Sequence, residues 1–116
     1  MSVRLEEKPF QVGERTYMLR CNMAVLDALE ERFGDFGAVV NLSARTGAAE
    51  IFAAMLNDYA EDQGWETDWT AAKVKKRFSW ADLLDADVMG IFSRAVIPAS
   101  AAGKATQPDK PGNSGN

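Results

Sequence analysis

The spacing of apolar residues changes from a strand period to a helix period within residues 10–34, and this change constrains the fold most. Phe10 and Val12 lie before Gly13, and Tyr17 and Leu19 follow it, each pair at alternate positions. Alternation around a glycine predicts a β-hairpin with strands at about 10–12 and 16–20, all four side chains facing one way. Because a two-stranded hairpin is marginally stable alone in water, it must pack on other elements.

The next segment predicts an amphipathic helix over residues 23–33. Asn22 is a favourable N-cap, and Gly34 lies where many helices end in a left-handed residue. Leu26 and Leu29 recur at helical spacing, with acidic side chains on the opposite face. We therefore expect this helix to cover the hairpin with its apolar side.

Three further helices are expected, at about 48–62 with Thr46 or Ser43 as its cap, at 71–78, and from Ser79 to Pro98. A short helical turn is expected between 35 and 46. Ser79 and Asp82 have the spacing of a capping box, and Pro98 ends the pattern. The expected inner side of the last helix consists of Leu84, Val88, Ile91, Phe92, Ala95 and Val96. The sequence thus predicts an α+β fold with a small N-terminal β-hairpin packed on about four α-helices.

The composition divides the chain into a domain at 1–98 and a tail at 99–116. The tail contains no Leu, Ile, Val, Phe, Tyr or Trp and is rich in Ala, Gly, Pro and Ser. Because such a segment cannot offset its ordering entropy by burial, we predict that it is disordered. Removing it should leave the thermal stability nearly unchanged.

Composition also indicates a soluble intracellular protein. No window approaches the roughly 20 apolar residues of a membrane span, and residues 1–10 lack the apolar stretch of a signal peptide. Cys21 is the single cysteine, so an internal disulfide cannot form. The net charge of −4 argues against a general nucleic-acid binder.

The sequence predicts a protein that is not an enzyme and holds no metal or cofactor. The chain has no histidine and no phosphate-binding glycine loop. Cys21 without a histidine partner is a poor nucleophile and is expected to be a packing residue. Asp27 and Glu31 share a helix face, which we interpret as a solvated surface or, alternatively, a docking face for a basic partner.

A partner-binding surface is predicted in the segment 65–80, which carries three tryptophans and a basic cluster. Tryptophan is common at binding hot spots, but these indoles could instead cap the ends of the core. The basic cluster could be a solvated face, or it could bind an acidic protein or single-stranded nucleic acid. Lys75 projects to a different side and is not included. The candidate residues are Trp65, Trp69, Trp80, Lys73, Lys76 and Arg77.

The segment from Phe10 to Gly34 resembles the opening of tail assembly chaperones from long-tailed bacteriophages, prophages and gene transfer agents. Its sequence is FQVGERTYMLRCNMAVLDALEERFG. In that family, a hairpin of the form F-x-hydrophobic-G-x-x-x-Y-x-L-R precedes a helix ending in L-x-x-L-E-E-x-hydrophobic-G. The matching residues are Phe10, Gly13, Tyr17, Leu19, Arg20, Leu26, Leu29, Glu30, Glu31, Phe33 and Gly34.

The resemblance implies a non-catalytic role in tail morphogenesis, in the cytoplasm of the bacterial host. Chaperones of this family bind the tape measure protein and help to recruit tail tube subunits. No nucleic-acid or membrane partner is expected, and self-association is left open. The alternatives are a structural tail-completion component of the virion and a small nucleic-acid-binding regulator.

Overall fold

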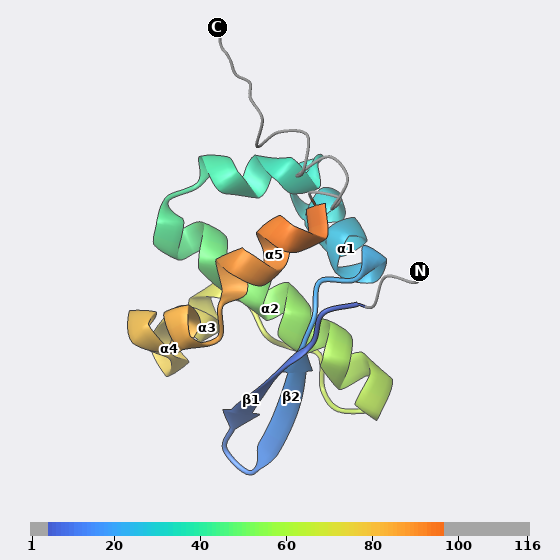
Figure 1. Cartoon of the computed structure of the whole chain (residues 1–116), viewed down its shortest axis with the longest axis vertical. Helices are drawn as coiled ribbons and strands as arrows, with labels where there is room; N and C mark the ends of the chain where they lie inside the picture. Colours follow the sequence, from blue (N-terminus) through green and yellow to red (C-terminus); the bar gives the residue numbers. More distant parts are fainter. Residues whose placement is uncertain (1–4, 97–116) are drawn as a thin grey trace, which may run out of the picture.

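The computed structural model describes residues 5–96 and confirms the α+β fold (Figure 1). A two-stranded antiparallel hairpin and a set of helices surround one apolar core. Pro98, the domain boundary at 98 and the predicted tail at 99–116 lie outside the described residues.

The hairpin pairs β1 (Lys8–Val12) with β2 (Arg15–Leu19), with Phe10 opposite Tyr17. Gly13 in the turn has a φ of 63°, which glycine adopts without steric cost. Tyr17 and Leu19 are buried, and the two apolar residues of β1 pack against them and their neighbours, so the predicted inner face is confirmed.

Helix α1 (Met23–Phe33) has the predicted bounds because both of its ends carry local signals. The Asn22 side chain accepts a hydrogen bond from the Val25 backbone N–H at 2.9 Å, and Gly34 ends the helix with a φ of 85°. Leu29 is 1% exposed, as its spacing predicts. The expected helical turn follows as the 3-10 helix η1 (Phe36–Asn41).

Helix α2 (Ala44–Gln63) begins four residues earlier than predicted. Its N-cap is Ser43, whose hydroxyl accepts a hydrogen bond from the Thr46 backbone N–H. Its first turn, residues 44–47, has no large apolar residue, and Gly47 in this turn lies close to η1. At Gly47 a Cβ would lie 3.0 Å from the Val39 carbonyl oxygen, so a larger residue would push the two elements apart.

The predicted last helix is two helices, α4 (Trp80–Asp85) and α5 (Val88–Val96). The capping box of Ser79 and Asp82 opens α4 as predicted. The break lies at Asp87, which has a φ of 57°, a left-handed conformation that aspartate tolerates better than most residues.

This break corrects the predicted inner side of the segment. Val88, Ile91 and Phe92 are buried as predicted. Leu84, however, is 61% exposed, and its neighbour Leu83 lies in the core instead. Ala95 is also exposed, whereas Val96 is partly buried against the core.

The core is organised around α2, which runs through the middle of the molecule in Figure 1. It contacts β2, α1, η1, α3 (Ala71–Arg77), α4 and α5, and α5 crosses over it. Because α2 is covered on most sides, nine of its residues are buried. The position of α2 between α3 and α4 also creates the candidate site.

Candidate functional site

Trp69 is a core residue that fastens the segment before α3 to α2. It is 9% exposed, and its indole Nε1 donates to the Tyr17 hydroxyl at 3.4 Å. The Asn57 side chain holds the Trp69 backbone from both sides, accepting from its N–H at 3.0 Å and donating to its carbonyl at 2.9 Å. Buried indoles usually satisfy their single donor in this way.

Trp65 is half-buried at the other end of the same segment. Its ring packs edge-on against Tyr17 and Tyr59, with centroids 5.1 and 5.8 Å away. The guanidinium of Arg15 lies 4.4 Å from the ring centroid, at cation–π distance. Trp65 and Trp69 thus cap the core, which is the alternative that the sequence left open for them.

The structure brings two of the three predicted basic residues, Lys73 and Arg77, beside the Trp69 ring. Lys73 pairs with Asp68 at 2.8 Å, and this hydrogen bond lowers the pKa of the Asp68 carboxyl. The Lys73 ammonium and the Arg77 guanidinium both lie within 6 Å of the Trp69 ring, at 5.4 and 5.6 Å. Lys76 is exposed and forms no ion pair within residues 5–96. A binding role for these residues stays a prediction.

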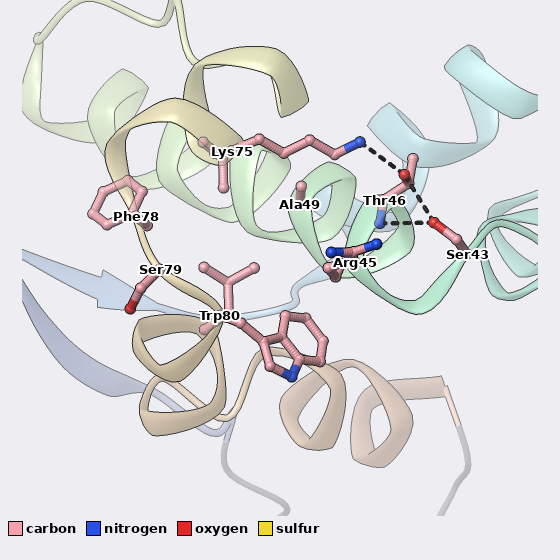
Figure 2. Close-up of a pocket in the computed structure, with 10 residues that line it drawn as sticks. Ser43, Arg45, Thr46, Ala49, Lys75, Phe78, Ser79 and Trp80 are labelled. Atoms are coloured by element: carbon pink, nitrogen blue, oxygen red, sulfur yellow. Dashed lines mark hydrogen bonds between the residues drawn. The ribbon is translucent and has the colours of Figure 1, made fainter.

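Trp80 is the tryptophan that lies at a surface pocket. It is 40% exposed and stands at the start of α4, facing the first turn of α2 (Figure 2). The pocket lies between α2, α3 and α4 and has a volume of about 340 Å³. It is lined by Ser43, Arg45, Thr46, Ala49, Val74, Lys75, Phe78, Ser79, Trp80 and Leu83.

The pocket has an apolar floor and a polar rim. Buried Ala49, Val74 and Leu83 contribute to the floor. Arg45 and Lys75 reach the rim from different helices, α2 and α3 (Figure 2). The arrangement can therefore receive an apolar group with a negative charge beside it.

One hydrogen bond across the rim joins α3 to the start of α2, and a second orders the first turn of α2 beside it. The Lys75 ammonium donates to the Thr46 hydroxyl at 2.8 Å, and the Ser43 hydroxyl donates to the same oxygen at 3.0 Å (Figure 2). The charged side chains of the lining are both cationic, although the chain carries a net charge of −4. The pocket thus concentrates positive charge on an acidic protein.

Sequence reasoning identified Trp80 but missed the cations beside it. The sequence predicts that Lys75 projects away from Lys73 and leaves it outside the candidate set, yet Lys75 is the lysine that lines the pocket. Arg45 was missed because the predicted start of α2 came too late. Ser43, one of the two caps that the sequence offers for this helix, is the observed N-cap and places Arg45 in the first turn.

The other candidate chemistry is structural. Cys21 is buried, and burial together with the nearby Asp58 charge raises the pKa of its thiol to about 11. Such a thiol is a poor nucleophile. Within residues 5–96, no group of three or more Cys, Asp or Glu side chains is placed to hold a metal ion.

No helix in the same part of the chain combines the length and apolar composition needed to cross a membrane. A comparison with protein-family models, with curated proteins and with solved structures finds no match to this chain.

Proposed function

We propose that this chain is a tail assembly chaperone of a long-tailed bacteriophage or prophage. In this proposal it binds the tape measure protein in the host cytoplasm and helps to recruit tail tube subunits, without catalysis. The observation that carries the proposal is the motif resemblance over residues 10–34, in which the shared glycines, leucines and arginine have structural roles in the hairpin–helix unit.

The shared glycines and leucines are explained by backbone geometry and burial. Gly13 and Gly34 both have positive φ, one in the hairpin turn and one at the end of α1. Leu19 and Leu29 are fully buried against α2 and its neighbours. Residues needed for such reasons make a motif that marks a fold rather than an active site.

The shared arginine has an equally specific place. Arg20 donates from Nε to Asp58 at 2.8 Å and also pairs with Asp62, both on α2. Burial disfavours the charge of Arg20, but its hydrogen bonds to Asp62 and Asp58 outweigh this effect and raise its pKa. The Asn22 amide donates to the same Asp58 oxygen at 2.8 Å, so one carboxylate joins β2 and the start of α1 to α2.

Co-expression with the client tests the proposal. The chaperone should be encoded beside a very long, mostly helical protein, which is expected to aggregate when expressed alone. Expression with the full chain should keep this protein soluble and allow the two to be purified together. A client that stays insoluble, or that separates from the chain on purification, would contradict the proposal.

The composition of finished particles separates a chaperone from a tail-completion component. A chaperone leaves the tail before completion, so mass spectrometry of purified particles should find the tape measure protein without this chain. Its presence at a fixed ratio to other tail proteins would instead favour a structural role.

A further inference from the structure

We propose that the pocket between α2, α3 and α4 binds an acidic segment of a partner protein that inserts one large apolar side chain. The apolar side chain lies on the floor beside Trp80, and carboxylates on either side of it contact Arg45 and Lys75. This inference rests on the geometry of the pocket and does not require the proposed function.

The size and floor of the pocket define the apolar part of the ligand. The volume of about 340 Å³ is near the lower end of the range of about 300–1,000 Å³ for ligand pockets, so it suits a side chain rather than a whole helix. Ala49 leaves this space open because its side chain ends at Cβ. Val74 and Leu83 contribute apolar surface that an aromatic or leucine side chain can cover.

The rim defines the charge of the ligand. Lys75 bonds to a neutral hydroxyl, and within residues 5–96 neither Lys75 nor Arg45 forms an ion pair. Lys73, two positions away on the same helix, does pair with a carboxylate. Two exposed cations without carboxylate partners at an apolar opening are complementary to an acidic, apolar segment.

Exposed apolar surface continues beyond the pocket along α4. Leu84 lies one turn after Trp80 on this helix, and both side chains are substantially exposed. Trp80 therefore forms one wall of the pocket that the inserted side chain enters, and Leu84 adds exposed apolar surface beside the pocket. Trp80 and Arg45 both line the pocket, and tryptophan and arginine are among the residues that most often dominate binding energy at interfaces.

The ligand comes from another protein, because the C-terminal segment of this chain has the wrong composition. Residues 99–116 contain two lysines and one aspartate and no Leu, Ile, Val, Phe, Tyr or Trp. This segment can supply neither the large apolar side chain nor the excess of negative charge. Charge and apolar complementarity thus exclude it as the occupant.

Selection from a library of random short peptides displayed on phage, with the full chain as bait, tests the inference. The selected peptides should share a large apolar residue flanked by Asp or Glu. The chain has three tryptophans and hence three indole N–H signals in an NMR spectrum of ¹⁵N-labelled protein. A selected peptide should shift the signal that Trp80→Phe removes, and leave those of Trp65 and Trp69 unchanged.

Charge reversal on α3 supplies a matched control. Lys75→Glu, at the pocket, should weaken binding of the selected peptide by about tenfold or more, because it places like charges together. Lys76→Glu makes the same change at an exposed neighbouring position outside the lining and should alter binding by less than about twofold. Unchanged thermal unfolding of both variants will show that they fold.

Each of the following results would overturn the inference: no enriched peptide, a neutral or basic consensus, equal effects of the two charge reversals, or an unshifted Trp80 signal. Dimers of the chain that Lys75→Glu dissociates would identify a second copy as the occupant and would also overturn it. If peptides bind as expected but co-expression does not keep the client soluble, the proposed function is wrong and the inference about the pocket is not affected. If co-expression succeeds but no peptide binds, the client uses another surface.

Discussion

Replacement of Asp58 by alanine should destabilise the protein, because this one carboxylate joins three elements. Asp58 accepts hydrogen bonds from Arg20 Nε and from Asn22 Nδ2, both at 2.8 Å. The side chains of Arg20 and Asp58 are only 12% and 11% exposed. The substitution therefore leaves a poorly hydrated guanidinium and an amide without their main acceptor.

The expected loss in the free energy of unfolding is about 2–4 kcal/mol. Hydrogen bonds to a charged group contribute about 1.5–3 kcal/mol each, and removing one partner of a buried ion pair costs about 3–5 kcal/mol. The estimate lies below the sum of these values because Arg20 keeps Asp62 and Glu7 as partners. Against a total stability of about 5–15 kcal/mol, the loss is large.

Urea unfolding followed by tryptophan fluorescence measures this loss, provided that the slope with denaturant is unchanged. Asp62→Ala is the matched control: its side chain also pairs with Arg20 but is 58% exposed, so its loss should be below about 1 kcal/mol. A double-mutant cycle of Asp58→Ala with Arg20→Met should give a coupling of at least about 1 kcal/mol. A loss below about 1 kcal/mol, with coupling below about 0.5 kcal/mol, would refute the reasoning.

Three further predictions follow from burial. Leu29→Ala should lower the free energy of unfolding in urea by about 2–5 kcal/mol, because Leu29 is buried. Leu84→Ala, at an exposed leucine, should change it by less than about 0.5 kcal/mol. Similar losses in the two variants would contradict the burial of Leu29 and the exposure of Leu84. Burial raises the pKa of the Cys21 thiol from its ordinary value of 9.0 to about 11. The contribution of the neutral thiol to stability is therefore complete below pH 9.0 and is lost as the pH rises toward about 11. The free energy of unfolding of the wild type should therefore fall by about 2 kcal/mol more than that of Cys21→Ala across this pH range. Parallel pH profiles of the two proteins would contradict the prediction. Removal of residues 99–116 should leave the melting temperature nearly unchanged, and a large decrease would contradict the composition argument.

The six predicted site residues show how far sequence could reach toward a binding surface. Tryptophan content pointed to a segment that borders the pocket, but it could not say which indole is buried. Trp69 and Trp65 acquire their environments from Tyr17 on β2, about fifty residues earlier in the chain. Only Trp80, which has no such covering partner, lies at the pocket.

The sequence by itself determined the hairpin and α1, because their signals act between near neighbours. A glycine in the turn, alternation on either side of it and the caps Asn22 and Gly34 specify backbone geometry within a few residues. The same locality explains why the capping box that opens α4 could be predicted.

Only the tertiary structure decided the break at Asp87, the exchange of Leu84 for Leu83 in the core, and the pocket. The pocket unites residues 43–49 with residues 74–83, and no local pattern encodes a contact across that separation. These features depend on how α3, α4 and α5 pack around the buried α2. That packing is stabilised by apolar surface that becomes buried between segments far apart in the sequence.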